Sequence, residues 1–248
     1  MSNSGTCWQV QINGWTADLE HMLRHFEGLP VRVTKDGKNG FLYQSEAFDA
    51  CSSSDEVLAI ANEEMRILSG VMRFVRSSDE PLRTGVVYRC HADGTRDVFV
   101  HVQDTLLVRA SEGDAHVIVT DAQGNVVKAA VPPPRTVAIA ALALRDGAVA
   151  KAMRLLAAAD VHSWVGLYRL YEVVEGDIGG ESALKDQGWG SATDLKRFKH
   201  SANSVSVGGD IARHGKELTV PPPNPMSLEE ASAYVTYLVS AWLSAKGV

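Results

Sequence analysis

The chain has 248 residues, of which 45% are hydrophobic and 22% charged, and its formal net charge is −6. These values are ordinary for a soluble globular protein and leave room for one large domain or two small ones. The acidic balance, with a pI near 5.7, argues against a broad nucleic-acid-binding surface, which normally gives a basic domain, but it is compatible with a local basic pocket.

The chain has three cysteines, Cys7, Cys51 and Cys90, which lie far apart and form no C-x-x-C pair. We therefore expect no structural zinc site, and a reducing, intracellular setting fits best. The first ten residues lack the pattern of a signal peptide, and the longest apolar run, at 136–144, is too short to span a bilayer. The sequence predicts a cytoplasmic protein without membrane contact.

The first 80 residues predict the element order β-α-β-β-α-β. Alternating apolar residues indicate short strands, and apolar residues at i, i+3, i+4 and i+7 indicate two helices. Glycines in the pairs Asp36-Gly37 and Asn39-Gly40 predict a hairpin between the second and third strands. This order is typical of a split βαβ sheet with its helices on one face. We expect the strands at 8–12, 31–33, 41–43 and 71–75, and the helices after Thr16 and Ser53.

Residues 85–130 predict an antiparallel meander, because short β-rich runs alternate with turn residues. The meander would either extend the first sheet or form a small sheet of its own. These runs lie at 86–88, 98–100, 106–108 and 117–119. The prolines at 132–134 end strand pairing, since proline lacks the N–H donor, and we place the domain boundary there.

From Arg135 onward the apolar period is helical, which predicts a bundle of about four helices. Gly179-Gly180 and Gly208-Gly209 are expected to break helices, Thr193 to cap one, and Ser227 with Glu230 to form a capping box. The predicted fold class is α+β, with an N-terminal α/β sheet domain and β-meander at 1–131 and a C-terminal helical bundle at 135–248.

Chemically active side chains concentrate in one segment of this helical half. Arg197, His200 and Asn203 follow one another at a spacing of three, so they share one helix face. A cation, an imidazole and an amide on one face suit phosphate recognition with proton transfer by the histidine. A solvated helix face that ends at Asn203 is the alternative interpretation, and for this helix alone it is the preferred one.

Arg213 and His214 follow a diglycine and Asp210, which predicts a helix start that favours anions. The alternative is a surface turn that ends at Gly215. Upstream, Glu172 borders an apolar helical stripe and Glu175 falls within it, so each carboxylate needs a partner or water. Arg197 and Arg213 are the candidate partners, in a structural ion pair or as residues that an acid orients for catalysis.

The remaining histidines predict no metal site. His21 and His25 lie at i, i+4 without a third ligand nearby, and His91, His101 and His116 lie on separate predicted strands. Surface positions are the simpler interpretation. The chain contains no Walker loop, no G-x-G-x-x-G and no G-x-S-x-G motif. We therefore expect neither a metal nor another cofactor.

The helical half resembles the HEPN superfamily of four-helix-bundle domains. The residues concerned are the run from Trp164 to Glu172, which resembles the acid-bearing second helix of that superfamily, and the segment Ala212-Arg213-His214-Gly215. Many members are metal-independent ribonucleases of toxin, anti-phage and CRISPR systems that dimerise to join two Arg/His motifs. The family motif places four to six residues between arginine and histidine, whereas Arg197 and His200 are closer here and Arg213 and His214 are adjacent.

Two functional hypotheses follow. The first is an RNA-cleaving or RNA-binding protein, acting without metal as a homodimer in a bacterial defence or toxin system. Its catalytic residues would be His200, Asn203, Arg213 and His214, with Arg197 and Glu172 in binding. The second is a non-enzymatic dimeric scaffold or ligand sensor, in which the same cluster is a structural network or a binding pocket. The acidic pI favours the second, and the crowding of polar groups favours the first.

Overall fold

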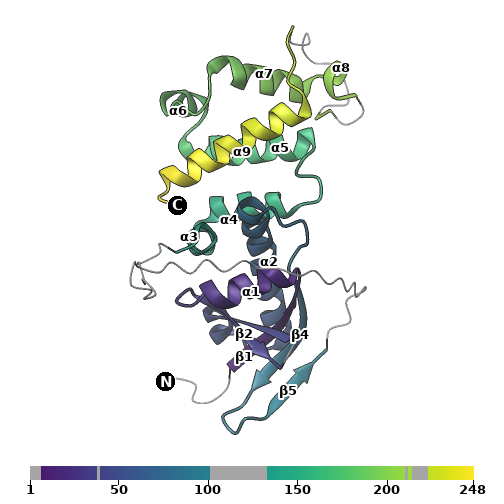
Figure 1. The fold of residues 1–248 in the computed structure, drawn as a ribbon, viewed down its shortest axis with the longest axis vertical. Coiled ribbons are helices and arrows are strands. Elements are labelled where there is room, and N and C mark those ends of the chain that lie inside the picture. The colour runs from purple at the N-terminus through teal and green to yellow at the C-terminus, as the bar shows by residue number, and fades with distance from the viewer. Residues whose placement is uncertain (1–6, 38–39, 101–132, 210–211, 214–222) are drawn as a thin grey trace, which may run out of the picture. The chain divides into compact units, whose positions relative to one another are not determined.

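A computed structural model describes residues 7–37, 40–100, 133–209, 212–213 and 223–248. The chain divides into two compact units (Figure 1). The first comprises Met1–Leu68 and Val75–Ala141, and the second comprises Ser69–Phe74 and Leu142–Val248. The fold class is α+β, as predicted.

The first unit contains a five-stranded antiparallel sheet in its described residues, with strand order β2-β3-β1-β4-β5. The helices α1 and α2 follow the first and third strands, so the observed order is the predicted β-α-β-β-α-β and the topology is that of a split βαβ sheet. The bounds are β1 Cys7–Asn13, α1 Thr16–His25, β2 Val31–Asp36, β3 Gly40–Ser45, the 3₁₀ helix η1 Glu46–Ala50, α2 Ser54–Arg76, β4 Arg83–Cys90 and β5 Arg96–Phe99.

Strand register brings four buried side chains of the sheet onto one face. Val10 of β1 lies opposite Tyr43 of β3 and Val87 of β4, and Val33 of β2 lies opposite Tyr43. All four side chains are at most 4% exposed. Because side chains directly opposite one another share a face of the sheet, these four lie on the same face and form part of the core of the first unit. Leu19 and Met22 of α1 and Val57, Ala61, Met65 and Leu68 of α2 are buried as well.

The strand predicted at 71–75 is wrong, because these residues continue α2 to Arg76. Met65, Leu68, Val71 and Met72 are all buried, and their spacing of three and four residues keeps them on one helix face. The fourth strand is instead β4, and β5 pairs with it across the turn at Asp93-Gly94. The predicted runs at 106–108 and 117–119 lie outside the described residues.

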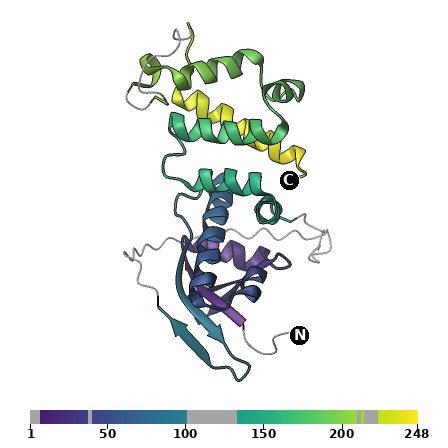
Figure 2. The same cartoon turned by 180° about the vertical axis from the view of Figure 1, so that it is seen from behind.

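The second unit is helical throughout the part that the structure describes. Its helices are α4 Gly147–Ala157, α5 Trp164–Ile178, α6 Glu181–Asp186, α7 Ala192–Asn203, α8 Val205–Gly208 and α9 Leu228–Ala245. Figures 1 and 2 show α5 and α9 side by side, and α5 also contacts α4 and α7. Gly179 ends α5 in the left-handed conformation at φ 95°, and Ser227 with Glu230 forms the expected capping box of α9.

The division between the units falls after Ala141, whereas the sequence predicts it at 132–134. The helix α3 (Arg135–Ala143) explains the shift, because its buried Thr136 lies 2.6 Å from the His21 Nε2 of α1. Residues 69–74 of α2 group with the second unit, where Arg73 donates to the carbonyls of Leu156 and Ala158, both at 3.0 Å. Among the described residues, no helix is long and apolar enough to cross a membrane.

Candidate functional site

The candidate site lies in the second unit, where α5 and α7 pack against each other. Ser163 accepts from the Gly166 N–H to cap α5, and Ser191, in place of the predicted Thr193, accepts from the Asp194 N–H to cap α7. Four aromatic rings join these helices to α9, with neighbouring centroids 5.6 to 5.8 Å apart. The packed rings hold α5, α7 and α9 together beside the polar side chains of Lys199 and Arg213. The rings belong to Tyr168, Tyr171, Phe198 and Tyr234.

Arg213 is held in one orientation by three neighbours. Its Nη2 donates to Glu172 Oε1 at 3.0 Å, and its Nη1 donates to Asn203 Oδ1 at 3.2 Å. Its Cζ lies 3.9 Å from the centre of the Tyr168 ring, which is a close cation–π contact. The Arg213 N–H also donates to the Ala202 carbonyl at 3.1 Å. The side chain is nevertheless 30% exposed, so the guanidinium is both fixed and accessible.

Asn203 links Arg213 to the end of α7. Its Nδ2 donates to the Lys199 carbonyl at 2.8 Å while its Oδ1 accepts from Arg213. These two contacts fix the orientation of the amide, because a flipped amide would present a donor to the arginine. The structure therefore brings together three of the six residues named from the sequence, Glu172, Asn203 and Arg213. Arg213 itself lies in a bend, and Asp210 and His214 lie outside the described residues.

The other two predicted residues lie on α7. His200 is half-buried and stands three residues before Asn203, and its side chain makes no hydrogen bond or ion pair within the described part of the chain. Arg197 has structural partners: its Nε donates to the Asn224 carbonyl at 3.0 Å and its Nη2 to the Pro225 carbonyl at 3.3 Å. It also lies 3.4 Å from Glu230. Arg197 thus fastens the segment before α9 to α7.

A second polar group, centred on Lys199, flanks the same aromatic cluster. Lys199 Nζ lies 2.8 Å from Glu181 Oε2 and 5.8 Å from the centre of the Tyr171 ring. Hydrogen bonds from Lys185 and Lys199 lower the pKa of Glu181 to about 2. The Glu181 hydrogen bond in turn raises the pKa of Lys199. Sequence reasoning missed this pair, although Lys199 and Asn203 stand at the i, i+4 spacing that places both on one face.

Tyr171 and Glu175 complete this side of the cluster. The Tyr171 hydroxyl donates to Glu175 Oε1 at 2.8 Å, so the carboxylate inside the apolar stripe has a tyrosine partner and no arginine. Burial and this hydrogen bond raise the pKa of Tyr171 well above its usual value. The phenol therefore stays protonated and acts as a structural donor.

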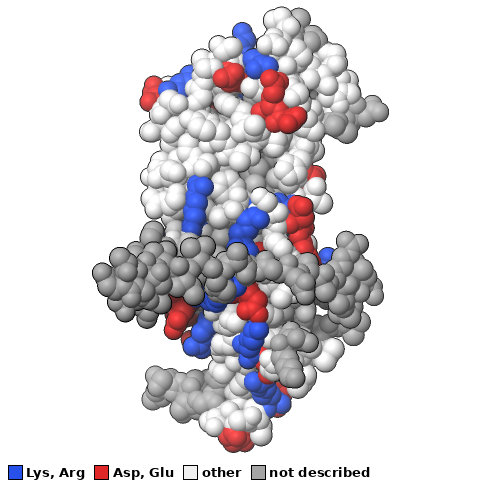
Figure 3. All heavy atoms as spheres, in the orientation of Figure 1, with Lys and Arg blue, Asp and Glu red and all other residues white. Residues whose placement is uncertain are grey.

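The fixed arginine suits anion recognition. The described residues contain no cluster of histidine, cysteine and carboxylate side chains able to hold a metal ion. In the view of Figure 3, Lys and Arg side chains are interspersed with Asp and Glu and form no broad basic patch. The face seen in this view therefore offers an anion no wide positive surface.

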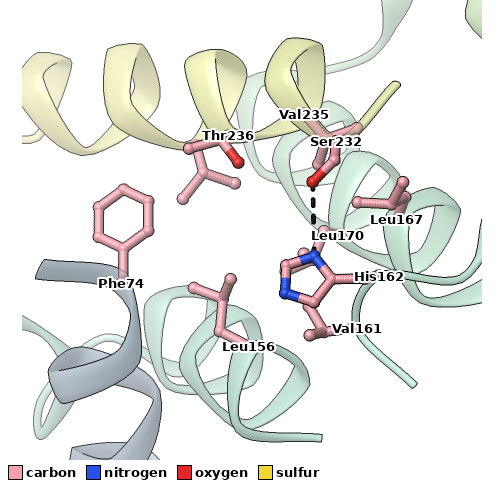
Figure 4. A pocket seen from close by; sticks show the side chains of 10 residues that line it. Phe74, Leu156, Val161, His162, Leu167, Leu170, Ser232, Val235 and Thr236 are labelled. Atoms are coloured by element: carbon pink, nitrogen blue, oxygen red, sulfur yellow. Dashed lines mark hydrogen bonds between the residues drawn. The ribbon is translucent and has the colours of Figure 1, made fainter. Parts of the chain in front are cut away.

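A separate apolar hollow lies among α2, α4, α5 and α9 within the second unit (Figure 4). Its volume is about 20 Å³, and its polar margin is His162, whose Nδ1 lies 3.4 Å from the Ser232 hydroxyl. A volume of this size holds about one water molecule, so the hollow is too small for an organic ligand. Phe74, Leu156, Leu167, Leu170, Val235 and Val239 are among its lining residues.

Comparison of the chain with protein-family models, with curated proteins and with solved structures gives no match. The resemblance to the HEPN superfamily therefore stays a prediction, and function is inferred from the residues themselves.

Proposed function

We propose that the helical unit is a HEPN-like module that binds single-stranded RNA at Arg213, and that His200 and His214 transfer protons in a metal-independent cleavage. The observation that carries this proposal is the fixed orientation of an accessible Arg213 guanidinium. Glu172, Asn203 and Tyr168 hold it in place, and preorganised groups bind a ligand without first losing conformational freedom.

The chemistry of Arg213 suits a phosphodiester. An arginine carries five N–H donors in a planar fork that matches phosphate oxygens, and two of these donors are engaged by Glu172 and Asn203. No other hydrogen bond joins the guanidinium to the described residues. The guanidinium carbon also lies over the Tyr168 ring, 3.9 Å from its centre. An RNA phosphate would thus meet a planar donor set that is already aligned.

Cleavage would follow the usual logic of a metal-free ribonuclease. A neutral histidine takes the proton of a ribose 2′-hydroxyl, and that oxygen attacks the adjacent phosphorus while the 5′-oxygen leaves with a proton from a second acid. Arginine stabilises the charge that builds on the phosphate oxygens. His200 supports this role because it lies one helical turn from Asn203 and has no structural partner among the described residues.

The test uses labelled single-stranded RNA with EDTA present, and measures binding by fluorescence anisotropy and cleavage on gels. Arg213→Ala should weaken binding roughly 10- to 100-fold, the scale of a charge-assisted hydrogen bond. His200→Ala and His214→Ala should keep binding and slow cleavage about a hundredfold or more. Arg169→Ala is the matched control, since Arg169 is an exposed arginine of α5 whose one ion pair with the described residues is with Asp160 at 3.4 Å.

Equal binding by wild type, Arg169→Ala and Arg213→Ala would contradict an RNA site at Arg213. Binding that depends on Arg213, with no cleavage in any variant, would leave an RNA-binding protein without nuclease activity. Light scattering on the same samples tests the proposed homodimer.

A second candidate function, a dimeric non-enzymatic scaffold or sensor, is favoured by the pairing of both cations with carboxylates. Arg213 pairs with Glu172, and Lys199 pairs with Glu181. Glu172→Gln separates the two functions. It keeps a hydrogen-bond acceptor but removes a negative charge, so an RNA site should bind RNA more tightly. A purely structural pair should show only a change in melting temperature.

A further inference from the structure

Two of the three cysteines face each other across the sheet of the first unit. In the antiparallel pairing of β1 with β4, Cys7 lies directly opposite Cys90. Residues in this relation have Cα atoms about 4.5 or 5.5 Å apart, and a disulfide requires about 4.4 to 6.8 Å. The backbone thus already holds these residues at bonding distance, although both are free thiols here.

The two thiols share the face of the sheet opposite the core. Val10 and Ile12 of β1 are buried, so Cys7, at odd spacing from both, lies on the other face. Cys7 is exposed and Cys90 is half-buried. The Cys90 thiol donates to Gln9 Oε1 at 3.2 Å, and Gln44 Nε2 lies 4.0 Å from the Cys7 sulfur. Each sulfur therefore lies next to a glutamine side chain, Cys90 beside Gln9 and Cys7 beside Gln44.

The surroundings distinguish the two thiols chemically. Burial and the neighbouring Cys7 thiol raise the pKa of Cys90, while Arg96, its partner on β5, acts in the opposite direction. Only the thiolate is an effective nucleophile. Cys7 is the more exposed of the two and is thus the residue that an oxidant in solution meets first, with Cys90 placed to resolve the product.

We propose that Cys7 and Cys90 form an oxidant-responsive pair that closes a disulfide between β1 and β4. With hydrogen peroxide as oxidant, the Cys7 thiolate attacks one peroxide oxygen, the O–O bond breaks, and Cys7 sulfenic acid and hydroxide form. The Cys90 thiolate then attacks the Cys7 sulfur and expels hydroxide. Overall, two thiols and one hydrogen peroxide give one disulfide and two water molecules.

The bond would link strands that are separated in sequence by α1, β2, β3 and α2. Cross-linking a long loop stabilises the folded state by restricting the unfolded chain, so the first unit should melt about 4–16 °C higher after oxidation. The position is independent of the Arg213 site, which lies in the other unit.

The experiment treats the reduced full-length chain with stoichiometric hydrogen peroxide and then alkylates the remaining thiols. Peptide mass spectrometry without reduction should show a Cys7–Cys90 linked peptide, two hydrogens lighter than the pair of thiol peptides, with Cys51 alkylated. The melting temperature should rise and return to its first value with reductant. Cys51→Ser is the matched control and should behave like wild type, whereas Cys7→Ser and Cys90→Ser should show neither change.

Several outcomes would overturn the proposal. They are a disulfide that involves Cys51, a covalent dimer as the main product, Cys7 sulfinic acid beside an alkylated Cys90, or three alkylated cysteines after peroxide treatment. Because serine is close to cysteine in size and both positions are on the solvent face, melting of the reduced variants shows independently that they fold.

Discussion

Adding one methyl group to α5 should have opposite effects on stability at two glycines ten residues apart. A Cβ on Gly166 would lie 2.2 Å from the Asp160 carbonyl oxygen and 2.8 Å from the Val161 Cα. Both obstacles are backbone atoms, which cannot rotate away as a side chain would. A Cβ on Gly176 would meet nothing within 4 Å.

The expected changes in the free energy of unfolding come from two opposing effects, helix propensity and overpacking. Glycine inside a helix is less favourable than alanine by about 0.5–1 kcal/mol, so Gly176→Ala should raise the free energy of unfolding by that amount. At Gly166 the same gain is opposed by an overpacking cost of about 1–3 kcal/mol. Because the clash is with backbone, we expect the upper end of that range and a net loss of about 2 kcal/mol. The melting temperature should fall by about 4–8 °C.

The assay is urea unfolding of both variants, followed by tryptophan fluorescence and far-UV circular dichroism. Gly176→Ala is the internal control for a change of helix propensity alone. If Gly166→Ala were as stable as wild type or more stable, the close approach of α5 to residues 160–161 would be refuted, and with it the position of the helix that carries Glu172.

Three further changes test the second unit. Lys246→Ala should lower the free energy of unfolding by about 1–3 kcal/mol, because Asp146 and Asp177 both lie within 2.9 Å of its Nζ; urea unfolding measures this. Phe198→Ala should cost about 3–5 kcal/mol by the same assay, since the ring is fully buried. The pKa of Glu181 in the folded state is lowered to about 2, so ionised Glu181 stabilises the fold above the pKa of the unfolded state, and this stabilisation is lost as the pH falls towards 2. Between pH 5 and pH 2 the melting temperature of wild type should therefore fall more steeply than that of Glu181→Gln.

The element order of the first unit could be predicted because each element carries its own local signal. Val10 and Ile12 alternate with polar residues in β1, and glycine marks the hairpin between β2 and β3. The error at 71–75 arose because valine favours strands. The burial of Val71 and Met72 three and four residues after Leu68 shows that the helical period outweighed this local preference.

The polar site was predictable only in part, because its contacts join segments far apart in sequence. Glu172 was expected to need a partner, and Arg213 was one of two candidates, yet helical phase alone could not choose between Arg197 and Arg213. The choice depends on the segment before α9, whose carbonyls at Asn224 and Pro225 occupy Arg197. No local pattern encodes such a contact between a side chain and a distant carbonyl.

The exposure of Glu172 decides whether its pairing with Arg213 opposes RNA binding. The Glu172 side chain is 46% exposed, and exposed ion pairs contribute little, about 0–1 kcal/mol, because water screens them. A phosphate could therefore displace Glu172 at small cost, while Asn203 and Tyr168 keep the guanidinium in place. Lys199 differs, because Glu181 binds it and Lys185 together. In the proposed function, Arg213 is thus the cation whose carboxylate the RNA phosphate would replace.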